Sequence, residues 1–148
     1  MGGSSSGTNS GSYAEFIVTD ATYVFPLHPR LSFAQGAALG VPFFTAYKAL
    51  ILRAKTKPGE IVLIHGASGA VGTAAVQIAR ALGAVVVGTA GTKEGMDVVS
   101  QCGAHHVFNH NHKSYEKKMV IIKLVRTFPS LFLNCSLGGS YRVLRCYH

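Results

Sequence analysis

The residues most suited to binding chemistry lie between His65 and Gly72, where the sequence reads HGASGAVG. Gly69 has no side chain, so the backbone can approach a pyrophosphate there, and Gly72 lets a following helix pack tightly against a strand. Free N–H groups at the start of that helix, with the positive end of its dipole, complete an anion site. Ala67 replaces the first glycine of the usual G-x-G-x-x-G pattern, with Gly66 just before it. A glycine turn that serves packing alone is the alternative.

The elements on either side of this turn favour nucleotide binding. The apolar run 61–64 predicts a strand, the residues from the turn to Leu82 predict a helix that stops at Gly83, and 85–87 predicts a second strand. Short, continuously apolar, β-branched runs are typical of a parallel sheet buried on both faces. A strand–turn–helix–strand unit of about 30 residues has the length of a crossover that holds a dinucleotide.

The end of the second predicted strand indicates which dinucleotide is bound. An NAD-specific site would place an acidic residue there, against the ribose hydroxyls. The chain instead has Thr89, Thr92 and Lys93, which offer hydroxyl groups and one positive charge. This set suits a 2′-phosphate and favours NADP(H). The alternative is that Lys93 is simply an exposed residue at a helix start.

Composition limits the class of protein. The 148 residues are 48% hydrophobic, which fits one compact α/β domain and excludes a disordered chain. No apolar run reaches the length of a membrane span. The three cysteines form no C-x-x-C pair, which argues against a disulfide framework or a cysteine zinc site and favours the reducing cytoplasm. We expect no metal site, because no cysteine or carboxylate accompanies the clustered histidines at ligand spacing: His105, His106, His110 and His112.

The sequence divides into four predicted parts: a flexible Gly/Ser-rich leader (1–12), remnant strands (13–30), a nucleotide-binding part (31–112) and a basic tail (113–148). The leader also fits the N-myristoylation pattern at Gly2, which Gly/Ser leaders match by chance. The tail carries seven basic residues and one acidic residue, out of a net charge of +8. One interpretation of the tail is a basic patch that binds RNA, a phosphorylated cofactor or a membrane. The other, which we favour, is a solvated helix face.

Further elements are expected from local patterns. Tyr13–Val18 and Tyr23–Leu27 read as short strands. Ser32-x-x-Gln35 is a capping box that starts a helix, which Pro42 interrupts. The helix resumes over 43–53, and a third helix ends at Cys102 before a strand at 106–109. We expect the helix over 43–53 to have an apolar side formed by Phe44, Tyr47, Leu50 and Ile51. Near the C-terminus, residues 131–133 and 141–144 could pair as a hairpin.

These residues resemble the zeta-crystallin-like quinone oxidoreductases, zinc-free members of the medium-chain dehydrogenase/reductase superfamily. The resemblance runs over residues 12–112 and is carried by these segments: 12–16, 35–38, 42–47, 65–72, 77–80, 88–92 and 103–110. It implies an α/β fold with a Rossmann-type parallel sheet and flanking helices, here incomplete and preceded by remnant strands of a GroES-like domain.

The family resemblance also implies NADP(H) as cofactor and a quinone or another electron-poor conjugated carbonyl as substrate. By resemblance Ser68, Gly69, Ala70 and Val71, with Gly72, line the cofactor phosphates. Gly91 and Lys93 would lie by the adenosine ribose phosphate, His110 by the adenosine end, and Thr45 near the nicotinamide. Since the chemistry is the cofactor's, no protein nucleophile or metal is expected, and the catalytic residues are unknown.

The chain also departs from the family. It has at most the last strands of the N-terminal domain that covers the nicotinamide, and the resemblance stops after His112. The sequence therefore reads as a truncated chain with one nucleotide-binding half and weak or no activity. A non-catalytic nucleotide- or RNA-binding module and a poorly folded chain are the alternatives, and a homo-oligomer is left open.

Overall fold

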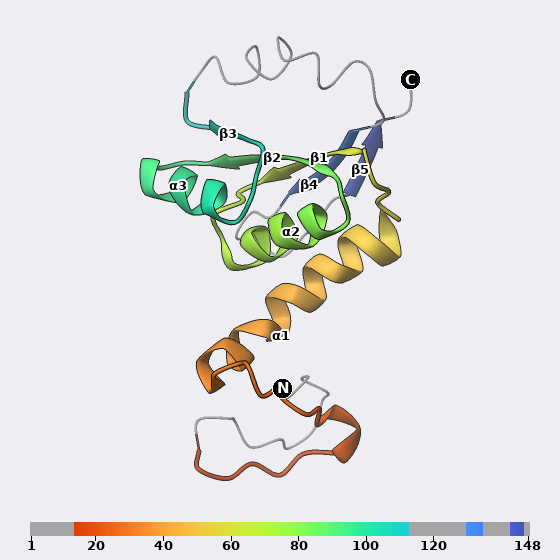
Figure 1. The fold of residues 1–148 in the computed structure, drawn as a ribbon, viewed down its shortest axis with the longest axis vertical. Helices are drawn as coiled ribbons and strands as arrows, with labels where there is room; N and C mark the ends of the chain where they lie inside the picture. The colour runs from red at the N-terminus through yellow and green to blue at the C-terminus, as the bar shows by residue number, and fades with distance from the viewer. Residues whose placement is uncertain (1–13, 113–129, 135–142, 147–148) are drawn as a thin grey trace. The chain divides into compact units, whose positions relative to one another are not determined.

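The computed structural model describes residues 14–112, 130–134 and 143–146, the last two segments by their backbone alone (Figure 1). These residues fall into two compact units, 1–40 and 41–148. None of the helices among the described residues is long and apolar enough to cross a membrane.

The described part of the first unit contains no strand, so the strands expected at 13–18 and 23–27 are wrong where the structure describes them. It forms a single 3₁₀ turn, η1 (Ala21–Tyr23), before its helix. The backbone groups of a strand need a neighbouring strand, and none is present in residues 14–40. Phe16 is 88% exposed and Phe25 72% exposed, so these aromatic side chains have no core to enter.

Helix α1 (Phe33–Tyr47) begins at the predicted capping box. The Ser32 N–H donates to Gln35 Oε1 at 2.9 Å, and the Gln35 N–H donates to Ser32 Oγ at 3.2 Å. The predicted interruption is also present, but the non-helical backbone is at Gly40 (φ −47°, ψ −121°), two residues before Pro42. Proline lacks an N–H and its ring crowds the preceding turn, so the helix breaks before the proline.

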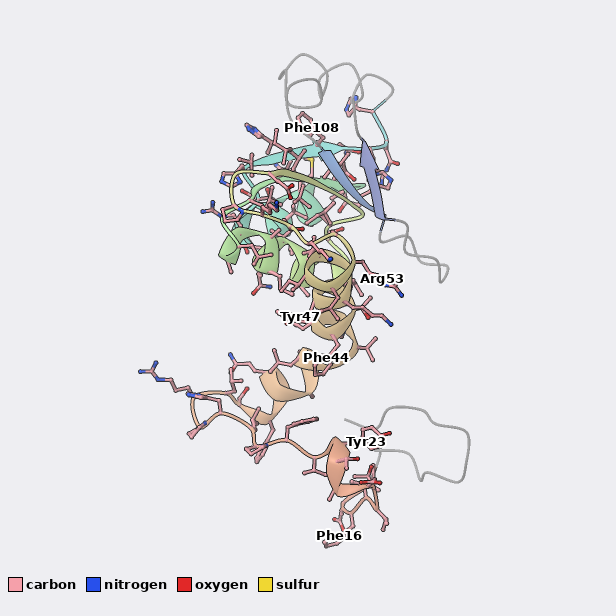
Figure 2. All side chains as sticks on the ribbon, turned by 90° about the vertical axis from the view of Figure 1, so that its right-hand side faces the viewer. Phe16, Tyr23, Phe44, Tyr47, Arg53 and Phe108 are labelled. Carbon is pink, nitrogen blue, oxygen red and sulfur yellow. The ribbon has the colours of Figure 1, made fainter. Side chains whose placement is uncertain are left out.

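After Gly40, α1 continues into a π-helical segment, η2 (Lys48–Arg53), in which the Ala54 N–H donates to Ala49 O, five residues back. Of the four apolar residues expected on one side of this helix, Leu50 is buried and Ile51 packs against the core, whereas Phe44 and Tyr47 are 62% and 46% exposed (Figure 2). The four therefore do not form one buried face. The buried face of this helix consists mainly of small side chains: Ala46, Ala49, Leu50 and Ala54.

In the described residues the sheet has five strands, in the order β3-β2-β1-β4-β5. Their bounds are β1 (Ile61–His65), β2 (Val85–Ala90), β3 (His106–Asn109), β4 (Ser130–Asn134) and β5 (Val143–Cys146). Neighbouring strands among β3, β2, β1 and β4 are parallel, and β5 is antiparallel to β4. The predicted parallel sheet is therefore confirmed. The antiparallel pairing expected near the C-terminus is also present, with its second strand beginning at Val143 and Leu133 opposite it.

Helices α2 (Ala70–Ala81) and α3 (Lys93–Gln101) pack on one face of the sheet, together with η2 (Figure 1). Val62, Ile64 and Val86 point to this face and join the main core cluster. Alternate residues of the same strands, Ile61, Leu63 and Val87, form a second buried cluster on the other face. Among the described residues, no helix contributes a side chain to that second cluster.

Gly72 fixes how closely α2 approaches the end of β1, as expected from its place in the turn. A Cβ at this position would lie 2.6 Å from both Ala67 Cα and Gly66 O. Both are backbone atoms of the turn, so they cannot move aside as a side chain would. The lack of a Cβ at Gly72 therefore permits the strand–helix contact.

We expect Gly72→Ala to lower the free energy of unfolding by about 1–3 kcal/mol, because the added methyl overpacks the turn. Gly69→Ser is the matched control: the nearest heavy atom to its Cβ would be Gly66 O at 3.5 Å, and serine is a favoured N-cap residue. Urea denaturation monitored by circular dichroism measures both changes. Equal stability of the two variants would contradict this account of Gly72.

Candidate functional site

The candidate site lies where β1 passes through a glycine turn into α2. Gly66 has φ +68°, in the left-handed region where glycine is strongly preferred. The Ala67 N–H donates to Thr89 O at 2.7 Å, and the Gly69 N–H donates to Gly66 O at 3.2 Å. The first bond attaches the turn to the end of β2 and the second closes the turn on itself, so the turn is held at the carboxyl edge of the sheet.

The strand order places this turn at a topological switch point. From β1 the sheet continues to β2 and β3 on one side and to β4 on the other. In open parallel sheets, ligands bind outside the carboxyl ends of the strands where the strand order reverses. His65, the last residue of β1, is opposite Asn134 of β4. The turn therefore begins at the carboxyl end of β1, next to the position where such sheets bind their ligands.

The N-terminus of α2 has free hydrogen-bond donors. Its N-cap, Gly69, has no side chain, and the first helical bond is from the Thr73 N–H to Gly69 O at 2.8 Å. Within the described residues, the N–H groups of Ala70, Val71 and Gly72 have no acceptor. The residues leading into the helix, Ser68, Gly69 and Ala70, are exposed. Free N–H groups and the helix dipole fit a phosphate group.

Helix α3 starts beside this turn but is capped. Thr92 Oγ1 accepts the Gly95 N–H at 3.0 Å. A Cβ on Gly95 would lie 3.1 Å from Ser68 Oγ, so the first turn of α3 is in contact with the glycine turn. Lys93, the first residue of α3, is exposed. The structure thus brings the two predicted binding segments, 68–72 and 91–93, to one end of the sheet.

His110 and Gly91 meet at the same edge. A Cβ on Gly91 would lie 3.0 Å from His110 Nε2, so the imidazole lies close against the Gly91 backbone. Asn111 Nδ2 donates to Gly91 O at 2.9 Å and fixes the segment that follows β3. The family resemblance placed Gly91 by the adenosine ribose phosphate and His110 by the adenosine end, and the structure brings these two residues side by side.

The buried Thr89 and the half-buried His65 form a polar centre at the turn. The Thr89 side chain is fully buried, and its Oγ1 accepts the Gly66 N–H at 3.2 Å. The same oxygen lies 2.8 Å from His65 Nδ1 and 3.2 Å from His110 Nδ1. The two rings are 4.9 Å apart between centroids. The sequence suggested that the Thr89 hydroxyl would serve the cofactor, whereas the structure engages it within the protein.

His65 was given no role by the sequence patterns. The signal for it is its position, because it is a polar residue directly after four buried strand residues and directly before the turn. Burial lowers the pKa of His65, and the positive charge that His110 can carry lowers it further. His105 is similar: burial lowers its pKa, with further contributions from Arg80 and His106.

Thr45 is not joined to these residues. It lies half-buried on α1, and no hydrogen bond in the described part of the chain connects it to the turn, α3 or His110. Within residues 14–112, no group of three or more His, Cys, Asp or Glu side chains could hold a metal ion. The basic tail lies outside the described residues except for the backbone of β4 and β5.

The chain is similar to several known proteins. A family profile described as zinc-binding dehydrogenase matches residues 70–139. The quinone oxidoreductase of Pongo abelii is 56% identical over 142 residues, which cover 94% of this chain and 43% of that protein. The CurK enoyl reductase structure has a TM-score of 0.71 at 33% identity, over 81% of this chain and 36% of that one. The quinone oxidoreductase of Thermus thermophilus, also solved with NADPH, has a TM-score of 0.58 at 40% identity, over 64% of this chain and 32% of that one.

The parallel sheet and its glycine turn define a Rossmann-type nucleotide domain of the medium-chain dehydrogenase/reductase superfamily. Within that superfamily, the chain belongs to the quinone oxidoreductase family. The chain spans 43% of the length of the Pongo abelii quinone oxidoreductase.

We expect the thermal stability of the chain to fall as the pH drops below about 6.5, the usual pKa of histidine. The folded state lowers the pKa of His65, so the unfolded state binds more protons below that pH and acid favours unfolding. His65→Gln should reduce the loss of Tm on acidification but not remove it, because His105 contributes in the same direction. His112→Gln, at an exposed position, is the control. Scanning calorimetry from pH 8 to pH 5 tests this, and identical pH profiles for wild type and His65→Gln would contradict it.

Proposed function

We propose that this chain binds NADP(H) at the turn between β1 and α2 and belongs to an NADPH-dependent quinone oxidoreductase. The observation that carries the proposal is the uncapped N-terminus of α2, with three N–H groups that have no acceptor in the described residues. A dinucleotide pyrophosphate supplies the acceptors that this helix end lacks. The likeness to a quinone oxidoreductase solved with NADPH supports the same choice of ligand.

Each part of the site then has a task in cofactor binding. Residues 68–72 hold the pyrophosphate through backbone N–H groups. Lys93 pairs with the 2′-phosphate, because it is exposed at the first position of α3 and the N-terminus of that helix also favours a negative charge. Gly91 and His110 contact the adenosine end, and Thr45 lies near the nicotinamide in the proposed complex.

The reaction is hydride transfer to a quinone or another conjugated carbonyl, and the bound cofactor supplies the hydride. The chain's own residues bind and orient the cofactor, and transfer depends on holding the two reacting carbons in line and close together. The likeness to an enoyl reductase supports the wider class of conjugated carbonyl substrates. The compartment we propose is the cytoplasm, in agreement with the cysteine spacing. A nucleotide-binding module without turnover is the second candidate, since the uncapped end of α2 accounts for binding and not for hydride transfer.

Gly69→Ser should weaken NADPH binding roughly tenfold while leaving the fold intact. The new hydroxyl would cap the free N–H groups of α2 that the proposal assigns to the phosphate, so it competes with the ligand. Isothermal titration calorimetry measures the affinity, and urea denaturation of the same sample measures the stability. Unchanged affinity in Gly69→Ser would refute the assignment of the pyrophosphate to this helix end.

Lys93→Met should reduce the affinity for NADPH by about tenfold and leave the affinity for NADH unchanged, because only NADPH carries the 2′-phosphate. Lys48→Met is the matched control, since Lys48 is an exposed lysine on η2. Fluorescence titration of the reduced nicotinamide compares the two cofactors in each variant. If both affinities fall equally, Lys93 does not select the 2′-phosphate.

Turnover separates the two candidate functions. With NADPH and a simple quinone, the enzyme proposal predicts oxidation of NADPH above the rate without protein, and the same rate should fall in Gly69→Ser. Saturable cofactor binding with no oxidation would instead favour the module without turnover. The absorbance of reduced nicotinamide follows the reaction directly.

A further inference from the structure

Three nitrogen atoms surround the buried hydroxyl of Thr89. The backbone N of Gly66 is 3.2 Å away, His65 Nδ1 is 2.8 Å away and His110 Nδ1 is 3.2 Å away. The side chain of Thr89 is fully buried, so water does not replace any of these partners. The three contacts join the end of β1, the glycine turn and the segment after β3 at one oxygen atom.

The Thr89 hydroxyl must make different hydrogen bonds to the two histidines. It has one hydrogen to donate and two lone pairs that accept. The Gly66 N–H can only donate, so it occupies one lone pair. One lone pair and one hydrogen remain for the two imidazoles. One ring must therefore donate its Nδ1–H to Thr89, and the other must accept the Thr89 hydrogen at an unprotonated Nδ1.

We propose that Thr89 couples the two rings so that His65 and His110 hold opposite protonation states at Nδ1, which makes Thr89 and His65 positioning residues for His110. The coupling itself follows from the hydrogen-bond geometry alone. Its consequence for ligand binding rests on the proposed nucleotide function, because that function places the adenosine end of the cofactor at His110 and Gly91.

The same geometry limits the charge of the pair. If both rings carried a proton at Nδ1, three N–H donors would face one oxygen, and the hydroxyl hydrogen would have no acceptor. A buried polar group without a partner is costly, so the two rings do not both carry a proton at Nδ1 and cannot both be charged. The two rings face each other at 4.9 Å between centroids, and in the described residues the Thr89 hydroxyl that joins them and the Gly91 backbone beside His110 carry no charge.

The coupling determines which donor the site presents to a ligand. The ring of His110 lies against Gly91, with Nε2 3.0 Å from where a Cβ would be. When a neutral His110 accepts from Thr89 at Nδ1, its Nε2 carries the hydrogen and donates outward. When His110 instead donates its Nδ1–H to Thr89, His65 accepts the Thr89 hydrogen, and the Nε2 of a neutral His110 becomes an acceptor rather than a donor.

The coupling is tested without any nucleotide by ¹⁵N NMR of the histidine rings in the 148-residue chain. The nitrogen shifts report directly whether each Nδ1 is protonated, and His65→Phe and His110→Phe assign the signals. At neutral pH we expect one protonated and one unprotonated Nδ1 in the wild type. Thr89→Ser, which keeps the hydroxyl, should preserve this difference, whereas Thr89→Val should abolish it. Equal Nδ1 states in the wild type, or an unchanged difference in Thr89→Val, would overturn the proposal.

Thr89→Val also removes the acceptor of the Gly66 N–H, so its fold is checked by circular dichroism. If this variant does not fold, His65→Phe provides the test. It removes one ring and leaves the hydroxyl free to donate or accept, so the remaining His110 should show an averaged Nδ1 state. A single fixed state of His110 in His65→Phe would show that His65 does not position it.

The consequence for binding is tested with adenosine 2′,5′-bisphosphate by calorimetry. Thr89→Val and His65→Phe should weaken its affinity roughly three- to tenfold, whereas Thr89→Ser should retain it. If Thr89→Val and His65→Phe both bind with wild-type affinity, the positioning role is refuted. If the wild type itself does not bind, the proposed nucleotide function fails, and the NMR result still decides the coupling.

Discussion

The attachment of the glycine turn to the end of β2 is the interaction on which the rest of the site depends. Thr89 provides it twice, through its carbonyl to the Ala67 N–H and through its hydroxyl to the Gly66 N–H. A glycine turn without such contacts would sample many conformations, because glycine has the greatest backbone freedom. With them, the start of α2 is fixed relative to the end of β2.

The two helices that begin at this edge of the sheet differ in a way that separates their roles. Helix α3 is capped by its own Thr92, whereas α2 starts at a glycine that offers no cap. A capped helix end is satisfied within the protein, and an uncapped end requires an acceptor from solvent or from a ligand. In the proposed complex the pyrophosphate therefore binds at α2, and at α3 the exposed lysine, rather than the helix backbone, is the main group available for a second phosphate.

Local patterns predicted the central unit well because each of its signals is local. Strand β1, helix α2 and strand β2 are marked by apolar runs and by glycines at fixed offsets, and the capping box at Ser32 and Gln35 needs only its own four residues. Two features could not be obtained in this way. The strands expected before residue 30 would need partners that the described residues do not contain. The hydrogen bonds of Thr89 join residues 21–24 positions apart, and no periodicity in the sequence reports such contacts.

The alanine-rich contact between η2 and α2 also explains why the apolar side expected from the sequence is not the buried face of α1 and η2. The larger side chains, Phe44 and Tyr47, indicated one face, but the core uses Ala46 and Ala49 from the helix and Ala75 from α2. Alanine has no rotamers to lose on burial, so ordering this contact costs little side-chain entropy. It also buries little area, and the backbones must lie close together for the contact to stabilise the fold. Such an interface has almost no spare volume, so during evolution a change in side-chain size on one helix would have to be matched by a change on the other.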